Sequence, residues 1–241
     1  MISKIVFFIV LTLLLTIVFA VIQQNSSLSF ERISLPQLAP AFAVIILYFF
    51  YKNLPSKVNF NIDIVLIPKY LTAFLLPIAL FGLAYFLTKQ IGVEVKPAEN
   101  LKQLVPIMLT GMVIGAFAEE IGWRSYLQPT IENEYSPLKA SIFTGLIWGL
   151  WHIGHYKNGV LFMIGFLLFT VSASILISWL LRETSSSLII AGLFHLAINL
   201  SFLIFFKNSM TDAKFMLVNG LIWLLPALIL ILTLGQNFSK T

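Results

Sequence analysis

The chain has 241 residues, of which 59% are apolar and 10% are charged, whereas an ordinary soluble domain is roughly 25% charged. This composition excludes an ordinary soluble globular protein. The absence of cysteine excludes disulfides and thiolate metal sites. The net charge of +5 comes from scattered residues, so it indicates a weak attraction to anionic lipid and no nucleic acid partner.

Eight apolar segments of about 15–22 residues are predicted to cross a membrane as helices. In chain order they lie near residues 5–22, 38–52, 68–88, 104–127, 138–156, 160–181, 188–206 and 215–233. The second is the shortest, and no polar stretch between them reaches the roughly 50 residues of a small domain. The sequence therefore predicts an all-α, polytopic integral membrane protein in which residues 1–241 form a single membrane domain.

The first apolar segment resembles a signal peptide, because Lys4 precedes it. Its length and the lack of a clear small-x-small cleavage site favour an uncleaved first helix. With a cytoplasmic N-terminus and eight spans, the inside loops and tails hold eight Lys and Arg residues, against seven outside. The positive-inside rule then predicts, by this narrow margin, that both termini are cytoplasmic.

The fourth segment carries Glu119, Glu120 and Arg124 near its end. Ionisable groups at membrane depth are costly and therefore indicate function. Glu120 and Arg124 are four residues apart, so they share a helix face and can form an ion pair. Glu119 points about 100° away, has no such partner within its own helix, and is expected to exchange a proton near neutral pH. The alternative is a structural charge cluster where the helix ends.

The fifth segment carries His152 on the same stripe as Gly145 and Gly149. Gly111 and Gly115 give the fourth segment a similar stripe. Glycine stripes allow helices to pack closely. We expect these stripes to bring the fourth and fifth segments together, and with them the acidic pair and the imidazole.

His155 lies one turn after His152 and is expected at the headgroup boundary, although an i, i+3 histidine pair could also bind a metal. Three tryptophans in these segments are interpreted as an aromatic belt or a pocket wall: Trp123, Trp148 and Trp151.

The seventh segment carries His195 and Asn199, four residues apart and so on one face. An imidazole beside an amide can bind a metal, orient a water or stabilise an oxyanion, and the alternative is an interhelical hydrogen bond. Together with Glu119 and His152, the pair supplies what a buried hydrolytic site needs.

Three motifs, each on its own apolar segment, together resemble those of the CPBP intramembrane proteases: Glu119-Glu120-x-x-x-Arg124, Trp148-x-x-x-His152 and His195-x-x-x-Asn199. This family, also called Abi, includes the type II CAAX prenyl endopeptidases and bacterial proteins of bacteriocin processing or self-immunity. The motifs follow the family's order, and the resemblance covers a core of about residues 100–205. At Trp148 the family usually has phenylalanine, and the exchange keeps an aromatic wall.

The resemblance implies that Glu119 activates a water with help from His152, that His195 and Asn199 complete the catalytic site, and that the Glu120 ion pair supports it. If a metal is used, His152 and His195 are its expected ligands. Two histidines and a glutamate suffice for zinc or another divalent metal, and a metal-free mechanism uses the same groups.

The best-known substrates of the family are prenylated C-terminal peptides. For a bacterial chain, which the short length favours, the expected substrate is a peptide bond in a membrane-associated peptide or protein. The expected partners are membrane lipid and this substrate, and the expected location is the bacterial plasma membrane. Bacteriocin self-immunity or peptide maturation are roles by analogy.

Two other functions compete with a protease. A proton-coupled transporter could use the buried acids and histidines as a relay, although the halves show no inverted repeat and the polar groups cluster in spans four to seven. A non-catalytic scaffold or immunity protein could sequester a toxin.

Helix geometry leaves one conflict. At about 1.5 Å per residue, Glu119 lies about 12 Å from the end of its helix if that end is near residue 127. His195 lies about 10 Å along its own helix, and His152, counted from residue 138, about 21 Å. The three meet only if the fifth helix starts well outside the bilayer or the helices tilt strongly.

Overall fold

A computed structural model of the chain describes residues 2–30, 32–51, 54, 58–95, 101–184, 186–207 and 209–238. Apart from one isolated bridge between Asn59 and Ser187, these residues form no β structure. The α-helices are α1 (Ile2–Gln24), α2 (Ala39–Phe50), α3 (Ile67–Gln90), α4 (Leu101–Gly122), α5 (Gln128–Glu132), α6 (Pro137–Trp151), α7 (Val160–Leu181), α8 (Leu188–Phe206) and α9 (Ala213–Phe238). Short 3-10 helices are η1 (Leu35–Leu38), η2 (Ile64–Leu66) and η4 (Ile153–Asn158), and η3 (Trp123–Leu127) is a π-helix.

Each of the eight predicted segments overlaps one α-helix, and α5 is the one α-helix among the described residues that was not predicted as a separate segment. The all-α membrane fold is confirmed. Within the described residues, five helices are long and apolar enough to cross a membrane: α1, α3 with η2, α7, α8 and α9. The other three predicted segments are not among the five. The second and fifth are too short, because α2 has 12 residues and α6 has 15. The fourth, α4, has 22 residues but is not one of the five helices.

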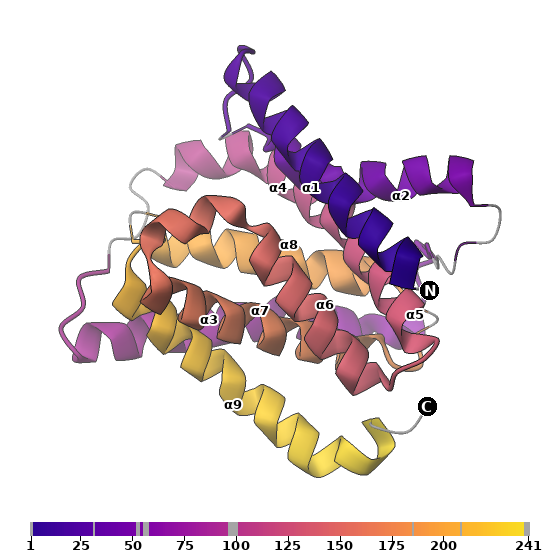
Figure 1. The fold of residues 1–241 in the computed structure, drawn as a ribbon. Coiled ribbons are helices and arrows are strands. Elements are labelled where there is room, and N and C mark those ends of the chain that lie inside the picture. Colours follow the sequence, from indigo (N-terminus) through magenta and orange to yellow (C-terminus); the bar gives the residue numbers. More distant parts are fainter. Residues whose placement is uncertain are drawn as a thin grey trace.

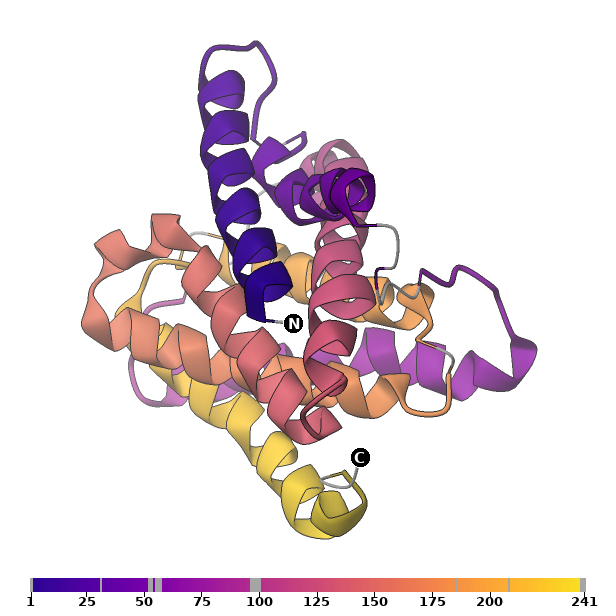
Figure 2. The ribbon, with the colours of Figure 1, turned by 45° about the vertical axis from the view of Figure 1, so that its right-hand side comes forward.

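The helices pack as a bundle with α7 and α8 inside it (Figure 1). α7 packs against α6 and α9, α8 packs against α3 and α4, and α2 joins α1 to α4. α1 stands at the edge of the bundle (Figure 2) and exposes a row of large apolar side chains, as expected of a lipid-facing helix. The N-terminal end of α1 and the C-terminal end of α9 lie at the same end of the molecule (Figure 1).

An aromatic cluster holds the inner helices together. The ring of Phe81 in α3 contacts Phe169 of α7, Phe202 and Phe206 of α8, and Trp223 of α9. Edge-to-face aromatic pairs add about 0.5–1.5 kcal/mol each beyond the burial of their area. This cluster fixes α8 and α7 relative to each other and so supports the polar side chains that the two helices carry nearby.

The predicted end of the fourth segment near residue 127 is wrong, because α4 continues through η3 into α5 as far as Glu132. Pro129, at the start of α5, has no N–H to donate, and its ring crowds the carbonyl of Ser125. The turn before it widens, and the N–H of Gln128 donates to the carbonyl of Trp123. A widened turn of this kind lets a helix pass a proline without ending.

The longer helix removes the depth conflict between the motifs. Measured from Glu132, Glu119 lies about 20 Å along its helix at about 1.5 Å per residue, close to the roughly 21 Å of His152 along α6. The short turn at residues 133–136 joins this continuous helix to α6. The acid and the imidazole therefore lie at the same level of one helical hairpin.

The two glycine stripes do not face each other, which corrects the expectation from sequence. A Cβ on Gly145 or Gly149 would collide with Val171 or Thr170 of α7. A Cβ on Gly111 would collide with the backbone at residues 32–33 instead. The glycines of α4 thus pack against the segment before α2, and the glycines of α6 pack against α7.

Candidate active site

All four predicted catalytic side chains line one cavity of about 120 Å³: Glu119, His152, His195 and Asn199. We call it the site cavity. It lies where α4, α6, α7 and α8 meet, and its other walls include Gln37 and His155. His155 therefore faces the same space as the four predicted residues, although the sequence placed it at the headgroup boundary.

Glu119 is fully buried and is held by three N–H donors. Gln37 Nε2 donates to its Oε1 over 2.9 Å. Trp148 Nε1 donates to its Oε2 over 2.9 Å, and Trp123 Nε1 donates to the same oxygen over 3.3 Å. A buried carboxylate is tolerated when its oxygens are satisfied by such donors, so this carboxylate is held in one orientation.

The partner that Glu119 has within its own helix is an uncharged donor, Trp123, which lies four residues later on the same side. Trp123 and Trp148 are 1% and 2% exposed. Of the two interpretations of these tryptophans, the pocket wall therefore fits Trp148, which lines the site cavity. Trp151 is also buried, and its Nε1 donates to Thr16 of α1 over 2.7 Å. Sequence pattern misses these roles because an indole N–H has no spacing signature.

Glu120 is fully buried and lies between two basic groups. Arg124 donates to Glu120 Oε1 over 3.1 Å, as their four-residue spacing allows. His195 Nδ1 donates to the same oxygen over 2.7 Å. The Arg124 guanidinium also lies 4.9 Å from the centre of the Trp148 ring, within range of a cation–π contact.

His195 therefore lies between both glutamates. Because a carboxylate accepts, the bond to Glu120 assigns a proton to Nδ1 and turns Nε2 toward Glu119 Oε2, 3.9 Å away. Asn199, one turn along α8, lines the same cavity. The acid at position 119 thus faces an imidazole and is buried away from lipid.

His152 caps α6 and begins η4. Its Nδ1 donates to the carbonyl of Trp148 over 2.8 Å. Nε2 is then the nitrogen that can accept a hydrogen bond from a water in the cavity. Its ring stacks on His155, with centroids 5.6 Å apart and planes 6° apart, and packs edge-on against Phe166. His152 is partly exposed, and its imidazole lines the site cavity just beyond the end of α6 at Trp151.

The described residues do not fit a metal ion. They contain no group of three or more His, Cys, Asp or Glu side chains close enough to hold one.

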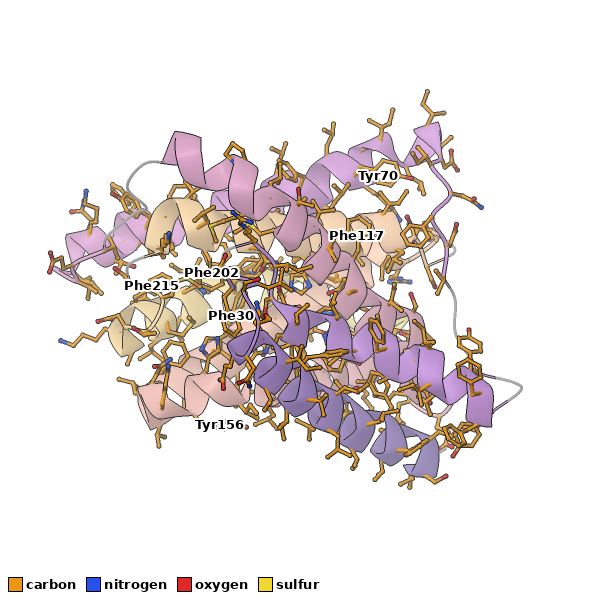
Figure 3. All side chains as sticks on the ribbon, turned by 90° about the horizontal axis from the view of Figure 1, so that it is seen from above. Phe30, Tyr70, Phe117, Tyr156, Phe202 and Phe215 are labelled. Atoms are coloured by element: carbon orange, nitrogen blue, oxygen red, sulfur yellow. The ribbon has the colours of Figure 1, made fainter. Side chains whose placement is uncertain are left out.

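Two larger cavities adjoin the site cavity. The α1 cavity, of about 620 Å³, lies between α1, η1 and η4, and includes Gln37 and His152 in its walls. The η1–α8 cavity, of about 320 Å³, includes Gln37 and Asn199. Figure 3 shows two of its apolar walls, Phe30 and Phe202. The loops around both cavities lie opposite the end of the bundle that holds the N-terminal end of α1 and the C-terminal end of α9 (Figure 1).

The fold and the cavity define a polytopic membrane protein with a buried carboxylate–imidazole site. Residues 101–201 match the family model described as "Type II CAAX prenyl endopeptidase Rce1-like". This segment carries the three motifs and every one of the four predicted catalytic residues. This part of the chain is similar to the family, as the three motifs predicted.

Curated relatives extend the similarity beyond that segment. Lysostaphin resistance protein A of Staphylococcus haemolyticus is 29% identical over 231 residues, which are 93% of this chain and 63% of that protein. The protein of the same name from Staphylococcus aureus is 29% identical over 211 residues, 85% of this chain and 50% of that protein. CAAX prenyl protease 2 of Methanococcus maripaludis is 27% identical over 147 residues, 56% of this chain and 53% of that protein. The chain thus spans between half and under two thirds of these relatives.

Proposed function

We propose that this protein is an intramembrane endopeptidase that hydrolyses a peptide bond of a membrane-associated peptide or protein. The observation that carries the proposal is the carboxylate of Glu119, buried and held by Gln37 and Trp148, with an imidazole nitrogen of His195 3.9 Å away. A carboxylate fixed in this way beside a cavity can act as a general base toward a bound water.

In the proposed reaction Glu119 takes a proton from water while the water oxygen attacks the carbonyl carbon of the substrate. His152 helps to orient this water through Nε2. Asn199 and the imidazolium form of His195, which carries a proton on Nε2 as well as on Nδ1, stabilise the negative charge that develops on the carbonyl oxygen. Glu119 then returns the proton to the leaving amine as the C–N bond breaks. Glu120 and Arg124 hold the imidazole of His195 in place. In the whole reaction one water is consumed and two peptide fragments form.

The substrate would lie across the three adjoining cavities, with the bond to be cleaved in the site cavity. The α1 cavity is lined mostly by apolar side chains, including Ile17, Val21 and Trp151. It therefore suits the apolar part of a substrate that reaches the site from the membrane. One relative is named a CAAX prenyl protease, so a prenylated CAAX peptide is the first probe. We further propose that the protein lies in a bacterial plasma membrane with both termini in the cytoplasm. Its proposed role is bacteriocin self-immunity or peptide maturation.

The test is hydrolysis by the purified protein in proteoliposomes. The probes are an internally quenched farnesylated CAAX peptide and an unprenylated peptide of one apolar membrane span. Glu119→Gln keeps the shape but removes the base, so the kcat should fall by about 100- to 10,000-fold. The matched control is Glu134→Gln, the same change at an exposed acid in the turn after α5, which should cleave like the wild type. Equal cleavage by both variants would exclude Glu119 as the base.

A chelator arm separates the two versions of the mechanism. We expect cleavage to continue after treatment with 1,10-phenanthroline, because the described residues contain no group of three or more His, Cys, Asp or Glu side chains that could hold a metal ion. Loss of cleavage that zinc restores would establish a metallopeptidase instead. A wild type that cleaves neither probe but carries out proton-coupled uptake would favour the transporter. Toxin protection that survives Glu119→Gln would favour the scaffold.

A further inference from the structure

Gln37 lies outside the segment that matches the family, in η1 between α1 and α2. Its side-chain nitrogen donates to Glu119 Oε1 over 2.9 Å, across 82 residues of sequence. The same side chain lines the site cavity, the α1 cavity and the η1–α8 cavity. Gln37 is therefore the point where the three spaces meet at the acid.

The segment that carries Gln37 is held from two sides. On one side, Gln23 of α1 is 2% exposed. Its amide donates to the carbonyl of Ile33 over 2.7 Å and accepts from the N–H of Leu35 over 2.8 Å. These two bonds fix the chain just before η1.

On the other side, the segment lies against the glycines of α4. An ideal Cβ on Gly115 would stand 2.4 Å from Gln37 Oε1, and one on Gly122 would stand 2.3 Å from Pro40. The carboxamide of Gln37 thus reaches Glu119 because position 115 has no side chain. Gly115, which the sequence interpreted as a helix-packing glycine, makes room for a polar contact.

We propose that Gln37 is a positioning residue that holds the carboxylate of Glu119 in its reactive orientation, an inference that rests on the proposed function. Trp148 and Trp123 hold one carboxylate oxygen, and Gln37 holds the other. With one oxygen released, the carboxylate can rotate about its terminal torsion, which is broad for glutamate. Water activation depends on this orientation.

The test uses two independent ways to break the same bond. Gln37→Ala removes the carboxamide, and Gly115→Ala displaces it without altering any polar group. Each should lower the kcat for the cleaved probe by about 10- to 100-fold, the range expected for a hydrogen bond to a charged group, with little change in KM. Gly82→Ala is the matched control, because a Cβ there meets nothing within 4 Å.

The double variant separates positioning from a structural role. In the Gln37→Ala background the added methyl at position 115 has no carboxamide to displace, so Gly115→Ala should have no further effect on the kcat. Equal losses from Gly115→Ala in both backgrounds, or an unchanged kcat in Gln37→Ala, would overturn the proposal.

A spectroscopic readout makes the test independent of turnover. The infrared carboxylate band that disappears in Glu119→Gln should shift in Gln37→Ala and in Gly115→Ala, and should stay in place in Gly82→Ala. A band that stays in place in all three would reject the role of Gln37. If the wild type cleaves neither probe, the proposed function fails, while the infrared spectra still decide whether Gln37 holds Glu119.

Discussion

The indole of Trp148 has a role that a phenylalanine cannot fill. Its ring packs against His195, with centroids 5.1 Å apart, and beneath the Arg124 guanidinium, as any aromatic ring could. Its Nε1 also donates to Glu119 over 2.9 Å. The resemblance predicted an aromatic wall here, and the departure from the family's usual phenylalanine adds a hydrogen bond to the acid.

We therefore expect Trp148→Phe to lower the kcat for peptide cleavage by about tenfold, the lower end of the range for a hydrogen bond to a charged group. The KM should hardly change, because the phenyl ring keeps most of the wall. Steady-state kinetics on the farnesylated probe measures both constants. A kcat equal to that of the wild type would mean that Gln37 and Trp123 suffice to hold the carboxylate.

Residues in the family motifs could be found from sequence because each pair is four apart on one helix. His195 and Asn199, and Glu120 and Arg124, follow from that spacing alone. Gln37 could not be found in this way. Its partner lies 82 residues away, and a single glutamine beside an apolar run reads as the end of a loop. The contact depends on how α2 packs on α4, which local spacing does not specify.

At the scale of helices, α7 and α9 depend on a close approach at Gly165. An ideal Cβ on this glycine would stand 2.6 Å from the backbone of Leu217, and one on Gly220 would stand 2.3 Å from the carbonyl oxygen of Gly165. Backbone atoms cannot move aside as the end of a flexible side chain can. The two helices would have to separate to admit a methyl group.

We expect Gly165→Ala to reduce the free energy of unfolding by about 1–3 kcal/mol, the usual cost of overpacking a core. The midpoint of thermal unfolding in detergent should fall accordingly. Gly82→Ala, in a helix with space around the glycine, is the control and should unfold like the wild type. If the two variants unfolded at the same temperature, the α7–α9 contact would be looser than the structure indicates.

The positions of the helices could be predicted from apolar runs, but not all of their ends. α7 and α8 match the predicted segments 160–181 and 188–206, since polar residues bound both runs. The fourth segment was predicted to end near 127, where the apolar run ends. The π-helical turn at Trp123–Leu127 lets the helix pass this proline, and no composition signal marks such a turn.

At the scale of the whole molecule, the succession of helices places the loops on two faces. Residues 25–30, 32–34 and 152–159 lie at one end of the bundle (Figure 1). The turn at 133–136 lies at the other end, with the N-terminal end of α1 and the C-terminal end of α9. The chain has no cysteine, so single substitutions give unambiguous labels. Ser26, Glu134 and Lys157 are exposed.

A membrane-impermeant maleimide should label Ser26→Cys and Lys157→Cys from the same side of sealed vesicles, and Glu134→Cys from the opposite side. The excess of Lys and Arg predicts that Glu134→Cys faces the cytoplasm. Right-side-out and inside-out vesicles make the comparison, and the cysteine-free wild type gives the background. Labelling of all three from one side would contradict the crossing pattern of the helices.

The segment around Gln37 packs on the glycines of α4 but lies outside the part of the chain that carries the catalytic residues. Residues 101–201 carry the acid and both imidazoles, whereas Gln23 and Gln37 belong to the preceding chain. A chimaera that takes residues 1–50 from a relative but keeps a glutamine at position 37 would receive a new rim around the same acid and imidazoles. Grafting of this kind offers a route to redirect which peptides the site admits.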